Sequence, residues 1–108
     1  MRERVLIVED NKALAKLIAK KMNAHVDMDI VVTHSYAEAI EAIEENDDFF
    51  IALLDINLPD APDGEVVDYV LSKNILAIIL TGSVDENLKK LFIQKNIVDY
   101  VVKDNLDA

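Results

Sequence analysis

Four short apolar runs in this chain each lead into residues that can take part in phosphoryl transfer. The runs are residues 5–8, 49–54, 76–80 and 99–102, and the residues at their ends are Glu9 with Asp10, Asp55, Thr81 and Lys103, in that order. Carboxylates bind divalent metal ions or attack phosphorus, a hydroxyl donates a hydrogen bond, and an ammonium pairs with phosphoryl oxygens. If the fold brings these side chains together, they predict a phosphoryl-transfer site that uses a divalent cation.

The elements that must position these residues can be read from the same sequence. Short runs rich in valine, isoleucine and leucine, separated by helical patterns, are typical of buried parallel strands. The predicted strands are about 4–9, 28–33, 49–54, 75–81 and 98–102, and the predicted helices are about 11–24, 36–46, 64–73 and 84–95. Ser35 with Glu38, and Ser83 with Glu86, have capping-box spacing. Because ligands of an open parallel sheet bind at the carboxyl ends of its strands, the candidate side chains should share one edge.

Length and composition restrict the class of protein. A chain of 108 residues with 52% hydrophobic residues is expected to form one domain, spanning 1–108. The net charge of −10 argues against a domain that binds the phosphate groups of nucleic acid. No apolar stretch approaches the roughly 20 residues of a membrane span, and no cysteine is present for a disulfide. We expect a cytoplasmic domain. Only five residues follow Lys103, so a final helix would be incomplete and should continue in further sequence.

Four motifs together resemble the receiver (phosphoacceptor) domain of bacterial two-component response regulators. They are VLIVEDN, LLDINLPDAPDG, ILTGS and DYVVK, and they occur in order over essentially the whole chain. The resemblance implies a flavodoxin-like, doubly wound, five-stranded parallel sheet of order 2-1-3-4-5, with helices on both faces and the fifth helix truncated. It also implies a signalling function in a phosphorelay, in which a sensor histidine kinase or a histidine phosphotransfer protein donates the phosphoryl group.

The resemblance also assigns roles to individual residues. Asp55 would be the phosphoacceptor, and Thr81 and Lys103 would contact the phosphoryl oxygens. Tyr100 would be the switch aromatic that responds to phosphorylation. The metal ion would be Mg²⁺, with Mn²⁺ able to substitute; Asp10, Asp55 and the backbone carbonyl of Asn57 would bind it directly, and Glu9 would act through a metal-bound water. Beyond phosphorylating and dephosphorylating itself the domain would not be an enzyme, and any effector enzyme would lie outside this chain.

Each of these residues also has an ordinary structural interpretation. Asp10 or Asn11 could cap the first predicted helix, and Asp55 could begin a turn. Thr81 could be a β-branched strand residue, and Lys103 could be a solvated strand end. Glu9 is harder to explain in this way, because an acid that ends a buried strand destabilises the fold unless it is paired or metal-bound. The two histidines, His25 and His34, lack neighbours at metal-ligand spacing and are expected to be surface residues.

Three other functions are compatible with parts of the pattern. A flavin or nucleotide binder would need glycine-rich phosphate loops, whereas the chain has two glycines. An aspartate-nucleophile phosphatase would need a second acid two residues after Asp55, where Asn57 stands. A pseudo-receiver, which binds proteins without being phosphorylated, is the remaining alternative.

The sequence departs from the usual receiver pattern near its two functional loops. Asp104 stands where the family usually has proline, and the loop from Asp55 to Gly64 is one residue longer than the common form. The segments VVDYV and KDN are similar to receivers that precede diguanylate cyclase domains, which suggests a C-terminal effector of that kind. The fourth predicted helix carries Leu88, Leu91, Phe92 and Ile93, more apolar surface than one buried stripe requires. We expect a partner or a homodimer contact at the face of helix 4, strand 5 and helix 5.

Overall fold

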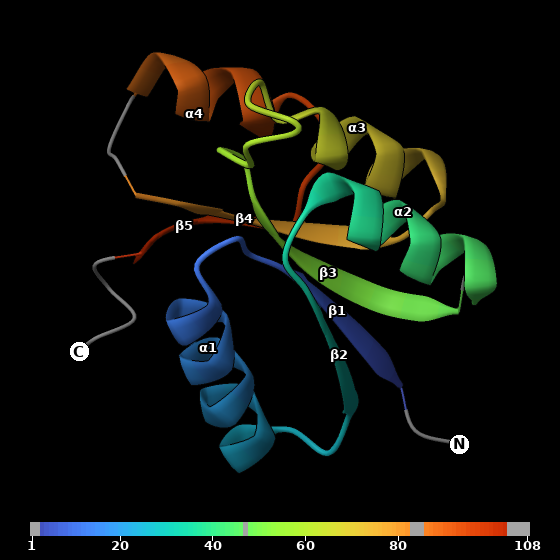
Figure 1. Ribbon diagram of the computed structural model, residues 1–108. Helices are drawn as coiled ribbons and strands as arrows, with labels where there is room; N and C mark the ends of the chain where they lie inside the picture. Colours follow the sequence, from blue (N-terminus) through green and yellow to red (C-terminus); the bar gives the residue numbers. More distant parts are fainter. Residues whose placement is uncertain (1–2, 47, 83–85, 104–108) are drawn as a thin grey trace.

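Strands and helices alternate strictly along the chain (Figure 1). The computed structural model describes residues 3–46, 48–82 and 86–103. Its elements are β1 (Arg4–Val8), α1 (Lys12–His25), β2 (Asp29–Thr33), α2 (Tyr36–Glu45), β3 (Phe49–Asp55), α3 (Glu65–Ser72), β4 (Leu76–Thr81), α4 (Glu86–Ile93) and β5 (Asp99–Val102). The expected fifth helix, Asp104 and the capping residue Ser83 lie outside the described residues. No helix in the described part of the chain is long and apolar enough to cross a membrane.

The five strands form one parallel sheet in the order β2-β1-β3-β4-β5, as predicted. Helix α1 lies on one face of the sheet, and α2, α3 and α4 lie on the other (Figure 1). Successive side chains of a strand point to opposite faces, so β1 contributes Leu6 and Val8 to one core and Val5 and Ile7 to the other. A central strand covered on both faces must be apolar throughout, which explains the unbroken run VLIV.

Local hydrogen bonds decide where the first two helices begin. Asn11, rather than Asp10, caps α1, because its side-chain oxygen accepts a hydrogen bond from the backbone N–H of Leu14 at 3.0 Å. Asp10 is therefore not used as the cap and remains available to the site. Ser35 caps α2 through the N–H of Glu38, as the capping-box spacing predicts.

The long loop between β3 and α3 is attached to the start of α2 by Asp60. One carboxylate oxygen of Asp60 accepts a hydrogen bond from the N–H of Tyr36 at 2.9 Å, and the other accepts from the N–H of Ala37 at 3.0 Å. These N–H groups belong to the first turn of α2, where they have no partner within the helix. The loop that follows Asp55 is thus held against the second helix.

The same loop ends in close contact with α4. Gly64 precedes α3 in the left-handed region, with φ of 76°. A Cβ atom at this position would lie 2.5 Å from Cζ of Phe92, which is itself buried. Only glycine satisfies both the backbone angle and the close approach of the Phe92 ring.

Candidate functional site

The strand register brings the predicted site residues to one edge of the sheet. Val8 of β1 pairs with Leu54 of β3. The residues that follow them, Glu9 and Asp55, therefore lie beside each other at the carboxyl ends of the two strands. Asp55 pairs with Leu80, one residue before Thr81. Thr81 pairs with Val102, one residue before Lys103. Residues separated by as many as 94 positions in sequence therefore meet, because parallel strands end at the same edge.

Glu9, Asp10 and Asp55 form an acidic cluster at this edge. Each offers one carboxylate oxygen, and the three oxygens lie within 4.8 Å of one another. Glu9 is fully buried, Asp55 is 1% exposed, and Asp10 is exposed. Hard divalent cations such as Mg²⁺ are bound by carboxylate oxygens together with waters, so one exposed and two buried carboxylates fit such an ion.

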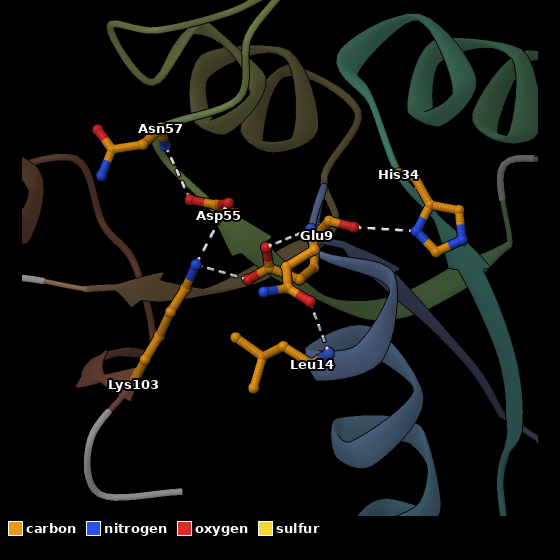
Figure 2. A network of polar contacts seen from close by, with 7 residues as sticks. Glu9, Leu14, His34, Asp55, Asn57 and Lys103 are labelled. Carbon is orange, nitrogen blue, oxygen red and sulfur yellow. Dashed lines mark hydrogen bonds and ion pairs between the residues drawn. The ribbon is translucent and has the colours of Figure 1, made fainter.

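Lys103 supplies the positive charge that faces this cluster. Its ammonium Nζ lies 2.6 Å from Oε1 of Glu9 and 3.3 Å from Oδ2 of Asp55 (Figure 2). Backbone N–H groups hold the remaining oxygens of the two acids. Asn11 donates to Oε2 of Glu9 at 3.0 Å, and Asn57 donates to Oδ1 of Asp55 at 2.9 Å. Both buried carboxylates are therefore fixed in orientation.

The pKa values reflect this environment. Burial raises the pKa of Glu9 to about 7, although the Lys103 ammonium and the N–H of Asn11 act in the opposite direction. The hydrogen bond that Asp10 shares with the Asp55 carboxyl group lowers the pKa of Asp10. Burial alone would lower the pKa of Lys103, but its contacts with Glu9 and Asp55 outweigh burial and raise the pKa. Strongly perturbed pKa values cluster at functional sites, so the raised pKa of the buried Glu9 agrees with a functional role for this edge of the sheet.

Thr81 and Tyr100 lie where the sequence pattern predicts, on β4 and β5. Thr81 is fully buried as the last residue of β4, beside Asp55 on the neighbouring strand. The half-buried Tyr100 packs against the core on the side of α2, α3 and α4. Its buried hydroxyl has no hydrogen-bond partner among the residues that the structure describes. The roles of these two residues in switching stay predictions.

His34 contacts the site and was missed by sequence reasoning. It was expected to be a surface residue, but it is partly buried and its Nδ1 lies 3.0 Å from the carbonyl oxygen of Glu9 (Figure 2). The available signal was its place directly after Thr33, the last residue of β2, which is the strand next to β1. His25, in contrast, is exposed at the end of α1, as expected.

Comparisons with known proteins agree with this fold. The family described as "Response regulator receiver domain" matches residues 5–107. A two-component system response regulator/GGDEF domain protein of known structure is 27% identical with a TM-score of 0.84; the alignment covers 98% of this chain and 42% of that protein. The present chain thus spans less than half of that relative. The comparison with curated proteins gave no match.

Two shorter structures are similar over nearly their whole length. A DNA-binding response regulator of the LuxR family from Staphylococcus aureus is 26% identical, with a TM-score of 0.82 and coverage of 94% of this chain and 87% of that chain. The BeF3-activated N-terminal receiver domain of Klebsiella pneumoniae RstA is also 26% identical, with a TM-score of 0.81 and coverage of 94% and 86%. The chain belongs to the response regulator receiver domain family and has the fold predicted for it, so it is a signalling domain of two-component systems.

Proposed function

We propose that this domain accepts a phosphoryl group on Asp55 from the phosphohistidine of a sensor histidine kinase or a histidine phosphotransfer protein. One observation carries the proposal: a nearly buried Asp55 lies 3.3 Å from the Lys103 ammonium and beside two further carboxylates. A purely structural acid at a strand end would not need two more acids close to it, because like charges repel. The arrangement suits a carboxylate that reacts beside a bound cation.

The chemical step is an in-line displacement at phosphorus. A carboxylate oxygen of Asp55 attacks the phosphorus, the new O–P bond forms, and the P–N bond to the donor imidazole breaks. The electron pair of that bond stays on the imidazole nitrogen, which then takes a proton. Because Asp55 Oδ1 accepts a hydrogen bond from the N–H of Asn57, Oδ2 is the oxygen we assign as nucleophile. Lys103, already next to Oδ2, would pair with the transferred phosphoryl oxygens.

Glu9, Asp10, Asp55 and the backbone carbonyl of Asn57 are the groups that would hold Mg²⁺, with Mn²⁺ able to substitute. The donor set fits, since all four are oxygen ligands and three carboxylate oxygens already lie within 4.8 Å of one another. When bound, the ion supplies positive charge that offsets the repulsion between the carboxylate and the incoming phosphoryl group. This chain's own contribution is the orientation of the Glu9 and Asp55 carboxylates, each of which accepts a hydrogen bond from a backbone N–H.

We further propose that phosphorylation changes the surface formed by α4 and β5. Thr81 and Lys103 would move onto the phosphoryl oxygens, and Tyr100 would respond through β5, the strand that leads directly into Lys103. The large apolar side chains of Leu91 and Ile93 on α4 are each 53% exposed, and that of Val98 before β5 is 54% exposed. Such residues are suited to an output partner or a second copy of the domain.

The domain would work as part of a longer cytoplasmic protein. The similarity to a GGDEF-containing response regulator supports a diguanylate cyclase as the effector. Catalysis by this chain would be confined to its own phosphorylation and dephosphorylation. Neither nucleic acid nor a membrane is proposed as a partner of this domain, because its net charge of −10 disfavours contact with the phosphate groups of both.

Labelling with acetyl phosphate and Mg²⁺, followed by intact-mass spectrometry, tests the function. The wild type should gain one phosphoryl group, and Asp55→Asn should gain none. Asp60→Asn, an acid in the following loop, is the matched control and should still be labelled. A label that persists in Asp55→Asn would refute the assignment. No label on the wild type, together with no response to beryllofluoride, would favour the pseudo-receiver that binds proteins without phosphorylation.

A further inference from the structure

His34 contacts the backbone that carries the acid pair. Its ring nitrogen Nδ1 lies 3.0 Å from the carbonyl oxygen of Glu9. A carbonyl oxygen can only accept, so Nδ1 carries the hydrogen and donates. In Figure 2 the His34 ring lies on one side of Glu9 and the Lys103 ammonium on the other. The two residues therefore hold different parts of Glu9, the imidazole its backbone and the ammonium its side chain.

This hydrogen bond has a direct consequence for Asp10. The peptide group between Glu9 and Asp10 is planar, so fixing its carbonyl oxygen fixes the direction in which the chain enters Asp10. On the preceding peptide, the N–H of Glu9 donates to the carbonyl of Thr33 at 3.1 Å. Thr33 and His34 thus hold the peptide groups on the two sides of Glu9. Asp10 is exposed and directly follows Glu9, which lies one residue beyond β1 and whose N–H still bonds to the end of β2.

His34 is itself held by the start of α2. Its backbone N–H donates to Oε1 of Glu38 at 3.2 Å, while Ser35 caps the helix. The pairing of β1 with β2 does not need the imidazole. The strand register runs from Arg4 to Val8, and the hydroxyl of Thr33 adds a hydrogen bond to the carbonyl of Ile7 at 2.9 Å. The imidazole bond is therefore additional to the sheet, and it acts on the loop that leads to the metal-binding carboxylates.

We propose that His34 is a positioning residue: by donating from Nδ1 to the carbonyl oxygen of Glu9, it orients the Glu9–Asp10 peptide and so places the Asp10 carboxylate for a divalent cation. This inference rests on the proposed function, because it concerns the same metal site. Removing an outer group that orients a metal ligand typically weakens metal affinity by about 10–100-fold, and the low end is expected here because His34 acts through the backbone.

The test compares Mn²⁺ binding by the wild type, His34→Ala and His34→Asn, measured by calorimetric titration of the whole chain. The amide nitrogen of asparagine lies close to the place of Nδ1 and can donate the same bond, so His34→Asn should retain most of the affinity. His34→Ala should weaken it by about tenfold. His25→Ala, at the exposed histidine of α1, is the matched control and should bind as the wild type does. If His34→Ala fails to fold, His34→Gln replaces it, because its longer side chain places the amide beyond Nδ1.

A metal-free readout accompanies the titration. Nitrogen-15 spectra of the imidazole in the wild type should show the hydrogen on Nδ1, as the contact with Glu9 requires. Equal Mn²⁺ affinity in His34→Ala and the wild type, or a hydrogen on Nε2 alone, would overturn the inference while leaving the proposed function intact. Absence of Mn²⁺ binding by the wild type would overturn the metal site and the inference together.

Discussion

The ammonium of Lys103 lies nearer to Glu9 than to Asp55, at 2.6 Å from Oε1 of the first and 3.3 Å from Oδ2 of the second. The Lys103 ammonium is thus shared between Glu9, a proposed metal ligand, and Asp55, the proposed phosphoacceptor. A phosphoryl group on Asp55 adds about two negative charges, which would compete with Glu9 for Lys103. This competition gives the site a way to change the end of β5 on phosphorylation.

Lys103→Met should destabilise the metal-free protein, because it leaves the fully buried Glu9 without its cation. The expected loss is about 1–3 kcal/mol at pH 7, below that of a fully buried pair, because Glu9 can take up a proton instead. The free energy of unfolding from urea titration measures it. Lys95→Met is the matched control: it breaks an exposed 3.0 Å pair with Asp68 and should lose about 1 kcal/mol or less. Equal losses in the two variants would contradict the role of Lys103.

A second substitution of Lys103, to alanine, should separate phosphorylation of Asp55 from the change in the α4 surface. We expect Lys103→Ala to retain some labelling by acetyl phosphate but to lose the response of the α4 surface. Amide hydrogen exchange of residues 86–95, with and without beryllofluoride, reports that response. The wild type should change its protection on addition of beryllofluoride, and the variant should not. Identical protection of the wild type under both conditions would rule out this switch.

Metal binding should depend on Asp10 more than on Glu9. Both oxygens of Glu9 already face Lys103 and the N–H of Asn11, whereas Asp10 is exposed at the cluster. Asp10→Ala should weaken Mn²⁺ binding by about tenfold or more. Glu9→Gln should have the smaller effect on affinity. Mn²⁺ titration decides the order, and binding by Asp10→Ala as tight as that of the wild type would exclude Asp10 as a ligand.

Asp60 should make stability depend on pH at the acidic end. Hydrogen bonds from the N–H groups of Tyr36 and Ala37 lower the pKa of Asp60 below its value of 3.8 in the unfolded chain. The unfolded chain therefore takes up this proton first as the pH falls, so the stabilisation is present above pH 3.8 and is lost as the pH falls through the folded pKa. Asp60→Ala should unfold at lower urea concentration at pH 7, and its difference from the wild type should shrink as the pH falls below about 4.

Asp63→Ala is the control for this loop. It removes the same charge at a position whose carboxylate accepts no hydrogen bond from the residues that the structure describes. Asp63→Ala should therefore lose less stability than Asp60→Ala at pH 7. A pH-independent difference between Asp60→Ala and the wild type would contradict the stabilising role of the ionised Asp60 carboxylate.

Gly64→Ala should destabilise the fold through two separable causes. The left-handed backbone angle disfavours any residue with a Cβ, and that Cβ would meet the ring of Phe92 at 2.5 Å. Together they should lower the free energy of unfolding by about 2–3 kcal/mol. In a double-mutant cycle, Phe92→Leu should recover part of the loss, because it removes the contact and leaves the backbone strain. A Cβ atom added at Gly82 would have no neighbouring atom within 4 Å, so Gly82→Ala should change stability little. Additive effects of the two substitutions would show that the ring does not restrict this position.

The sequence alone determined the alternation of elements, the parallel sheet and the five residues at the strand ends. Buried parallel strands must be short and apolar, and their carboxyl ends must share an edge, so the pattern of residue types is sufficient to group Glu9, Asp55 and Lys103. The cap at Ser35 was equally local, since it depends only on residues three positions apart.

The tertiary structure decided the contacts between loops. Asp60 reaches the first turn of α2, and His34 reaches the carbonyl of Glu9. Each of these contacts joins residues at least 24 positions apart through a backbone group, and every residue carries such a group, so no pattern of residue types marks it. The position of Lys103 between two acids likewise depended on how far its side chain extends across the sheet edge, which only packing could decide.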